Sequence, residues 1–428
     1  MTRCSRDSTI GRSTAFLSRR RARRSREGAE PQNCSDVVVS STTEPGPAVL
    51  QQWDRFVDTV PGADVAQLSV WARIRHGAGF RPLYLLARID GRLVGGALVL
   101  ERRLPVVGRF GYVSNGPLVC PSVDRAPVVD QLVTALVDLA RTRLRALFVQ
   151  PPTGGEDVST SLRKRGFRPS TAGIAPAASV RIDLHRDCED LHRRLTKANR
   201  RRTRNWDRRG VTVRVGSPDD AKPLADLLAR TAEHQRFEPL SPDYIARMHR
   251  ELDDDRHAVV FVAELDDAPV AALLCTCCNG TVKQRISGMD RSERARSSGV
   301  SAATVWHAML WAKSRGYDTY DLGGLRAEPA RQLLAGRSGR TAALTGSEQF
   351  KTSFGGEVYL YPEQVELISS PLLRRAYDFS RHTHIGTRAV EIGKRALRGG
   401  RGSQAAGRRP RHRADGEHLG LRRDVRSP

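Results

Sequence analysis

The chain has 428 residues and a mass of 47.3 kDa, and its 71 Lys and Arg residues against 47 Asp and Glu residues give a formal net charge of +24. That length predicts two or three domains. The longest uncharged apolar run, residues 268–278, is shorter than the about 20 residues that a helix needs to cross a bilayer. Residues 1–25 also lack the apolar stretch of a secretion signal. We therefore expect a soluble, cytoplasmic protein.

Positive charge is concentrated in three segments. Residues 1–46 and 394–428 are rich in Arg, Ser and Gly and have little hydrophobic periodicity, which predicts disordered basic tails. The third segment, residues 193–209, lies inside the chain and holds nine basic residues and one acid. Outside these three segments the charges nearly balance.

The internal basic segment is predicted to be a helix. Leu191, Leu195 and Ala198 recur at helical spacing, and Gly210 is a stop signal. The cations on the other faces are more numerous than solubility requires, so we expect them to attract a polyanion such as tRNA. The residues expected to do so are Arg193, Lys197, Arg200, Arg201 and Arg204.

A weak internal repeat organises the rest of the chain. Residues 87–98 and 263–274 match at an offset of 176, and each predicts a β-hairpin with a tight turn, at Asp90-Gly91 or at Asp266-Asp267. Helices precede each hairpin, and a helix followed by a strand comes after it. This order, present twice, predicts an α/β protein of two similar domains.

Capping signals and apolar periodicity locate the helices around the hairpins. Ser217-Pro218 and Ser241-Pro242 each predict the start of a helix before the second hairpin. After the two hairpins, apolar residues at helical spacing run over 132–139 and 305–312 and lead into strands.

Five groups of short motifs follow one another along the chain. They are Trp71-Ala-Arg-Ile-Arg75 with Gly79-Phe80-Arg-Pro82; Tyr112-Val-Ser-Asn-Gly-Pro117; Ala198–Arg204 leading to Gly210-Val211; Trp311-Ala-Lys313 with Tyr320-Asp-Leu-Gly-Gly324; and Phe350-Lys-Thr-Ser-Phe-Gly-Gly356. In this order they resemble motifs of the Fem family, the aminoacyltransferases that build peptidoglycan interpeptide bridges. Two positions depart from the family pattern, because Arg75 stands where Lys is usual and Asn115 where Arg is common.

The resemblance implies a fold and a domain plan. The fold is α/β, with two tandem GNAT-like acyltransferase domains whose mixed, mostly antiparallel sheets are flanked by helices. The domains are expected at 47–180 and 181–356, with a flexible insertion at 326–347. A C-terminal segment, 357–393, is expected to pack on the first domain, through a helix that carries Leu372.

The resemblance also implies an aminoacyltransferase of the EC 2.3.2 type. In this family an amine on the stem peptide of a peptidoglycan precursor attacks the ester carbonyl of an aminoacyl-tRNA. Lys351 matches the lysine that stabilises the resulting oxyanion. Asp321 is expected to orient an amine. Neither a cofactor nor a metal is expected to take part.

Five further residues are expected to bind substrate. Arg75 and, by position only, Arg236 would hold the pyrophosphate of the precursor, because a planar guanidinium suits phosphate oxygens. Phe350 precedes the catalytic lysine. Gly355 and Gly356 would let the backbone approach substrate closely.

The expected partners are aminoacyl-tRNA as donor and a lipid-linked or UDP-linked peptidoglycan precursor as acceptor, with peripheral contact at the inner face of the plasma membrane. Three alternatives remain open. One is an acyl-CoA-dependent GNAT-type N-acyltransferase, because Arg296-Ser-Ser-Gly-Val-Ser301 approximates a pyrophosphate-binding loop before a helix. The second transfers an amino acid from tRNA to a small natural-product acceptor. The third is a non-enzymatic nucleic-acid binder.

Overall fold

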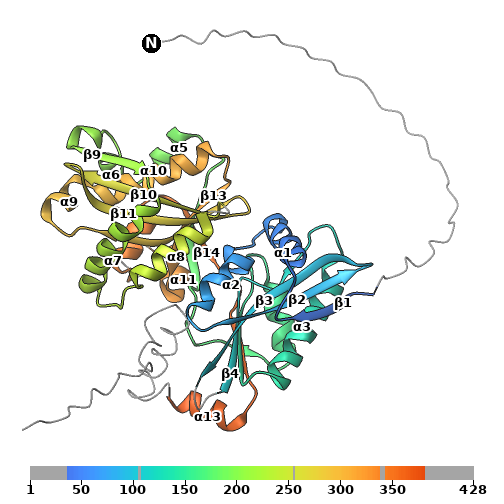
Figure 1. Ribbon diagram of the computed structural model, residues 1–428. Coiled ribbons are helices and arrows are strands. Elements are labelled where there is room, and N and C mark those ends of the chain that lie inside the picture. The colour runs from blue at the N-terminus through green and yellow to red at the C-terminus, as the bar shows by residue number, and fades with distance from the viewer. Residues whose placement is uncertain (1–35, 105–107, 254–255, 338–342, 381–428) are drawn as a thin grey trace, which may run out of the picture. The chain divides into compact units, whose positions relative to one another are not determined.

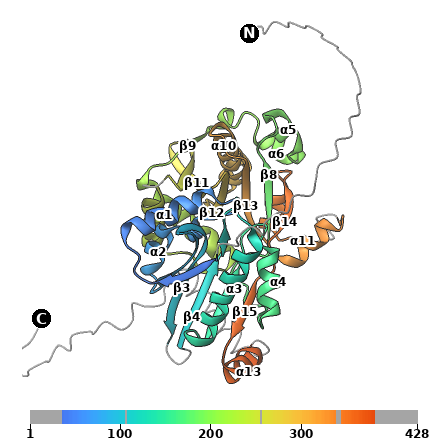
Figure 2. The ribbon, with the colours of Figure 1, turned by 90° about the vertical axis from the view of Figure 1, so that its right-hand side faces the viewer.

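The computed structural model contains two mixed sheets, each covered by helices (Figures 1 and 2). The structure describes residues 36–104, 108–253, 256–337 and 343–380. The predicted basic tail at 394–428 lies outside the described residues. We call each sheet with its helices the first half and the second half of the molecule. Both halves belong to one compact unit that begins at Val37.

The first sheet is made of β1 (Val38–Thr42), β2 (Arg81–Ile89), β3 (Arg92–Leu104), β4 (Gly108–Ser114), β5 (Leu118–Val119), β6 (Ala146–Gln150), β7 (Arg168–Pro169) and β15 (Val365–Ile368). The strand order is β1-β2-β3-β4-β6-β15-β7, and β5 pairs with β3. The β4–β6 pair is parallel, whereas β1–β2, β2–β3, β3–β4 and β6–β15 are antiparallel.

The second sheet is made of β8 (Ala178–Asp183), β9 (Val211–Val215), β10 (Ala258–Leu265), β11 (Ala268–Cys278), β12 (Thr281–Met289), β13 (Thr319–Leu325) and β14 (Glu357–Leu360). Its order is β14-β8-β13-β12-β11-β10-β9. Here β12 and β13 are the parallel neighbours, at the place that β4 and β6 occupy in the first sheet. The two halves therefore repeat one topology, as the sequence repeat predicts.

The helices of the first half are α1 (Pro47–Thr59), the short 3-10 helix η1 (Val65–Gln67), α2 (Ser69–His76), α3 (Arg125–Thr142), α4 (Glu156–Lys164) and α13 (Pro371–Ser380). Those of the second half are α5 (Cys188–Arg194), α6 (Lys197–Arg202), η2 (Asp207–Arg209), η3 (Pro218–Asp220), α7 (Ala221–Gln235), α8 (Pro242–Asp253), α9 (Glu293–Ser298), α10 (Val300–Ser314), α11 (Ala327–Leu334) and α12 (Gly346–Thr352). Across the described ranges, every helix is too short or too polar to span a membrane.

The two predicted hairpins form at the predicted turns. Asp90 and Gly91 join β2 to β3, and Asp266 and Asp267 join β10 to β11, with positive φ at all four residues. Aspartate and glycine tolerate this backbone conformation, which gives a two-residue turn the twist of the strands it joins. The predicted helices also form. Before α7, for example, Ser217 and Asp220 make the capping box that the sequence predicts.

One hydrophobic cluster joins the two halves. It contains Trp53 and Ile74 from α1 and α2, and it continues through Leu224 of α7 and Ile245 of α8 to the second sheet. Helices α3 and α4 cover the opposite face of the first sheet (Figure 2). Because the burial of apolar surface drives packing, this shared cluster fixes the first half against the second.

Three predicted boundaries differ from the structure. The N-terminal tail is predicted to reach residue 46, but β1 pairs with β2 in the described part of that segment. The boundary between residues 180 and 181 falls inside β8, all of which pairs in the second sheet. Within 357–393, β15 extends the first sheet as expected, whereas β14 pairs with β8. Strand pairing decides these boundaries, and sequence composition does not reveal it.

Two further segments also differ from the prediction. The segment 193–209 is not one helix, because Leu195 adopts an extended conformation that ends α5, and Thr196 caps a separate helix, α6. The segment 326–347 contains α11. Arg326 at its start is held by Glu348, whose carboxylate accepts from both the backbone and the side chain of Arg326.

Candidate active site

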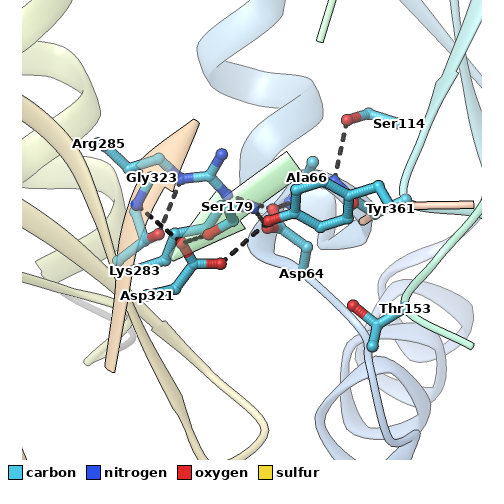
Figure 3. Close-up of polar contacts among 12 residues, drawn as sticks. Asp64, Ala66, Ser114, Thr153, Ser179, Lys283, Arg285, Asp321, Gly323 and Tyr361 are labelled. Atoms are coloured by element: carbon cyan, nitrogen blue, oxygen red, sulfur yellow. Dashed lines mark hydrogen bonds and ion pairs between the residues drawn. The ribbon is translucent and has the colours of Figure 1, made fainter. Parts of the chain in front are cut away.

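A buried ion-pair network connects the two halves. Asp64, the cap of η1, accepts from Lys283 at 3.3 Å and from Arg285, both on β12. Its carboxylate also accepts the backbone N–H of Ala66 at 3.0 Å. Figure 3 shows Lys283, Arg285 and Asp321 of the second half close to Asp64 of the first half. The network thus holds the loop before α2 against the second sheet.

Electrostatics keep this network charged. Burial alone would raise the pKa of Asp64, but the charges of Arg285 and Lys283 outweigh burial and hold that pKa well below its usual value. Burial alone would lower the pKa of Lys283, but Asp64 raises it above its usual value. A buried charge is tolerated where it is paired and hydrogen-bonded in this way.

Asp321, predicted as catalytic, lies at the centre of the second sheet on β13. It is 1% exposed and accepts from the hydroxyl of Ser179, from the Tyr361 hydroxyl at 3.0 Å and from the Gly323 N–H at 2.8 Å. Burial alone would raise its pKa, but Lys283 and these hydrogen bonds lower it. Since its oxygens already accept three hydrogen bonds from protein groups, Asp321 orients the Gly323–Gly324 segment.

Lys351, also predicted as catalytic, lies on α12 next to that segment. Its Nζ donates to the carbonyl oxygen of Gly324 at 2.7 Å. Burial lowers the pKa of Lys351, and Asp321 and Glu348 partly oppose the shift. Asp321 and Lys351 are therefore brought to the same segment, Asp321 by the Gly323 N–H and Lys351 by the Gly324 carbonyl.

A cavity of about 650 Å³ opens beside Lys351. Its walls come from α7, α10, α12 and the strands β11 and β12, and they include Phe350 as well as Lys351. Gln284 of β12 also lines it, and the side-chain oxygen of Gln284 is buried with no hydrogen-bond partner among the described residues. A buried acceptor without a donor costs free energy. The cavity therefore offers a cation and an acceptor to a polar ligand.

Arg75, predicted to bind phosphate, is buried at the end of α2. Its guanidinium donates to the Tyr244 hydroxyl of α8 at 3.1 Å and lies 4.6 Å from the centre of the Phe80 ring. Arg102 lies over the same ring at 5.5 Å. Burial lowers the pKa of Arg102, and the nearby charge of Arg75 lowers it further. An anion between the two guanidinium groups would relieve this repulsion.

Arg236, also predicted to bind phosphate, lies at the end of α7. Arg236 is the exposed, left-handed residue that ends α7, with φ +56°. It lies one residue beyond Gln235, which lines the cavity beside Lys351.

Gly355 and Gly356, predicted to approach substrate, lie against neighbouring protein backbone. A Cβ on Gly355 would lie 2.4 Å from the Arg194 carbonyl oxygen, and a Cβ on Gly356 would lie 2.6 Å from the Arg181 carbonyl oxygen. Gly355 also has φ +76°. These glycines are required where the chain after α12 passes against α5 and β8.

Four of the five predicted polyanion-binding residues lie on α6 or just after it. Lys197, Arg200, Arg201 and Arg204 line an open hollow of about 880 Å³. Arg200 donates to two backbone carbonyls of the α5 end, which fixes its side chain. Arg193 instead pairs with Asp190 at 2.8 Å, outside the hollow. Asn199 of α6 donates to the hydroxyl of Ser353 at 2.6 Å, which ties this surface to the end of α12.

The alternative phosphate loop has helical geometry. Residues 296–298 are the last residues of α9, and the Arg296 N–H donates to the Ser292 carbonyl inside that helix. Gly299 packs on Arg202 of α6. A pyrophosphate-binding loop needs its N–H groups directed at the ligand, and the Arg296 N–H is not available for that because it is bonded inside α9.

Several residues of the site lie outside the sequence motifs. Asp64, Lys283 and Arg285 belong to none of them, and neither does Tyr361, whose ring lies 5.1 Å from the Lys283 Nζ. One signal was available: Lys283 and Arg285 alternate in an apolar strand pattern, and only seven residues of the chain are lysines. Charges at alternate positions share one face of a strand.

Comparisons with known proteins agree with this fold. A family model described as an acetyltransferase (GNAT) domain matches residues 192–351. Lipid II:glycine glycyltransferase of Staphylococcus aureus (strain MRSA252) is 25% identical over 228 residues, which cover 50% of this chain and 54% of that protein. The protein of the same name from strain USA300 matches to the same extent. The chain thus spans about half the length of the curated relatives it matches.

A solved structure extends the likeness over most of the described chain. The crystal structure of FemX superimposes with a TM-score of 0.65 at 18% sequence identity, and the match covers 78% of this chain and 99% of that one. The two GNAT-like halves, the order of the motifs and the sequence relatives are all consistent with this likeness. The chain has a GNAT-type fold, and it is similar in sequence and in structure to proteins of the Fem type.

Proposed function

We propose that this protein is an aminoacyltransferase that moves an amino acid from aminoacyl-tRNA to the stem-peptide amine of a peptidoglycan precursor. The observation that carries the proposal is the position of Lys351, a half-buried cation that lines a cavity of about 650 Å³. The sequence relatives are named for glycine transfer to lipid II. Glycine is therefore the amino acid to test first.

The reaction forms one bond and breaks another. The acceptor amine attacks the ester carbonyl carbon, and the carbonyl oxygen takes a negative charge. The bond from that carbon to the ribose oxygen then breaks, and the ribose oxygen receives the proton that the amine loses. A fixed cation lowers the barrier because it stabilises the oxyanion more than the uncharged ester.

Lys351 has the chemistry for that role. Burial makes its ammonium a stronger hydrogen-bond donor than a solvated lysine, and the Gly324 carbonyl holds it in place. The unpartnered Gln284 oxygen on the same cavity suits an ammonium or amide N–H of the aminoacyl group. Asp321 acts through Gly323 and Gly324 and is a positioning residue in this scheme.

The donor and the acceptor have separate candidate surfaces. The basic hollow at α6 suits the tRNA backbone, and Asn199 connects it to α12, which carries Lys351. Arg75 and Arg102 around Phe80 suit the precursor's pyrophosphate. A lipid-linked acceptor would require the protein to work at the inner face of the plasma membrane.

The experiment is transfer of radiolabelled glycine from charged tRNA to UDP-linked or lipid-linked muropeptide, with Lys351→Met beside the unaltered protein. The proposal predicts transfer that ribonuclease abolishes and that Lys351→Met strongly reduces. Repeating it with a total charged-tRNA pool identifies the amino acid if glycine is not the donor.

Binding of coenzyme A distinguishes the main alternative, an acyl-CoA-dependent N-acyltransferase, from the proposed function. Ligand binding raises thermal stability according to RT ln(1 + [L]/Kd). Stabilisation by coenzyme A, together with no transfer from any aminoacyl-tRNA, would overturn the proposal in favour of an acyl-CoA donor.

A further inference from the structure

Helix α13 exposes two large apolar side chains on one side. Leu372 and Phe379 are 76% and 73% exposed, the highest values among the large apolar side chains of the described residues. Arg375 and Ala376 are exposed with them. These positions fall on one side of a helix, at spacings of three, four and seven residues. Exposed apolar residues that cluster on one face mark an interaction surface.

The opposite side of α13, which carries Leu373, Arg374, Tyr377 and Asp378, is partly buried. Arg374 pairs with Glu366 of β15 at 2.9 Å and with Asp378 at 2.7 Å, and Glu366 is fully buried. Glu366 also accepts from the Ser170 hydroxyl at 2.7 Å. The contact of Arg374 with the buried Glu366 carboxylate fixes the rotation of the helix. Helix α13 therefore contacts β15 of the first sheet through Arg374, and Leu372 takes no part in that contact.

A basic hollow borders this exposed face. It has a volume of about 610 Å³ and lies between α13, β15 and the ends of α3 and β7 (Figure 2 shows α13 beside β15). Its charged residues are Arg141, Arg168, Arg374, Arg375, Glu366 and Asp378. Since Arg374 already pairs with both acids, the three remaining arginines leave the hollow positive.

We propose that the α13 face, formed by Leu372, Arg375, Ala376 and Phe379, docks the protein on an anionic lipid bilayer. The Leu and Phe side chains would enter the boundary between headgroups and acyl chains, and the arginines around the hollow would meet lipid phosphates. Apolar residues beside cations on one helical surface are the features that hold a helix in the membrane interface.

Charge argues against two other occupants of this face. The sequence that follows the helix, residues 381–428, holds thirteen basic and four acidic residues, so it would meet like charge at the arginines. In a symmetric dimer through the same face, the arginines of two copies would also oppose each other. An anionic bilayer complements both the charge and the apolar face.

The docking face is linked to the candidate acceptor site. Ser369, just before α13, donates its backbone N–H to the Arg145 carbonyl at 3.1 Å, and the Arg145 N–H donates to the Arg109 carbonyl at 2.7 Å. The next residue, Phe110, contacts Phe80, over which Arg75 lies. The inference rests on the proposed function in one respect, because docking serves catalysis only if the acceptor is lipid-linked.

The test is sedimentation of the full chain with vesicles of phosphatidylcholine, either alone or mixed with phosphatidylglycerol. We expect binding to the mixed vesicles, and a loss of about tenfold or more in partitioning for the double variant Leu372→Ser, Phe379→Ser. The matched control is Phe237→Ser, Leu334→Ser, which removes exposed apolar side chains elsewhere and should change partitioning less than about twofold. Arg375→Glu should weaken binding several-fold at low salt.

Equal binding of the unaltered chain and the Leu372→Ser, Phe379→Ser variant would overturn the proposal. So would a monomeric chain that binds no vesicles, because its own sequence would then cover the face. A chain that binds no vesicles and that light scattering finds dimeric would overturn it in favour of a second copy. Vesicle binding without transfer to either a UDP-linked or a lipid-linked acceptor would instead contradict the proposed function and leave the docking face standing.

Discussion

Lys283 on β12 lies 3.3 Å from the carboxylate of Asp64, although 219 residues separate them in the chain. Arg285 joins the same carboxylate, and the positive charge of Lys283 also lowers the pKa of Asp321. The contact between the halves is therefore coupled to the strand that positions Gly323 and Gly324 beside Lys351.

Replacing the buried acid should destabilise the protein. Asp64→Asn leaves Lys283 and Arg285 buried without their partner, so the free energy of unfolding should fall by about 3–5 kcal/mol at pH 7. Urea unfolding measures the change. The control is Asp157→Asn, because Asp157 pairs with Arg125 at 2.7 Å on the surface, where a pair contributes about 1 kcal/mol or less. Similar losses for both variants would contradict the importance of the inter-half network.

The same acid predicts a pH dependence. Because the folded state depresses the pKa of Asp64, its stabilising contribution is complete above the unfolded-state pKa of about 3.9. It is lost as the pH falls through the folded-state pKa. The stability difference between the unaltered chain and Asp64→Asn should therefore shrink below about pH 4. A difference that stays constant down to pH 2 or so would be inconsistent with this shift.

Removing the Lys351 ammonium should affect the reaction more than the fold. Lys351→Met should lower kcat by about 10²–10³, the usual effect of losing one oxyanion donor. Lys313→Met is a matched control, since Lys313 Nζ also donates to a backbone carbonyl, that of Leu184 at 2.8 Å. Both variants lose one such hydrogen bond, so equal rates for the two would refute a catalytic role for Lys351.

The Gly355–Gly356 segment should tolerate no side chain. Gly355→Ala should cost about 2 kcal/mol or more, because the new methyl group would meet the Arg194 backbone and the residue has positive φ. Gly346→Ala at the start of α12 meets no atom within 4 Å and should be neutral or slightly stabilising. Thermal unfolding compares the two. An unchanged midpoint for Gly355→Ala would exclude the packing role.

The α6 surface should bind RNA through charge. Reversing Lys197, Arg201 and Arg204 to Glu should weaken tRNA binding and reduce the slope of log affinity against log salt by about 1 for each lost phosphate contact. The control reverses exposed Arg55, Arg92 and Lys164 of the first half, which changes the net charge equally. Filter binding at several salt concentrations distinguishes them. Equal losses would indicate attraction by net charge alone.

Local signals in the sequence determined much of the architecture. The turns at Asp90-Gly91 and Asp266-Asp267, the capping box at Ser217 and the repeat itself are encoded within a few residues. Hairpins and caps depend on short-range backbone preferences, which a sequence displays directly. Lys351 and Asp321 were predicted because they lie in motifs, and the structure brings both to Gly323 and Gly324.

Contacts between distant segments were decided only by the tertiary structure. Asp64 meets Lys283 across the two halves, Gly355 is required by the Arg194 backbone, and β14 and β15 separate to different sheets. The outward turn of Leu372 and Phe379 likewise follows from the Arg374–Glu366 ion pair. Hydrophobic periodicity gives a helix its two sides, but which side is buried depends on the partner that it meets, and that partner is distant in the chain.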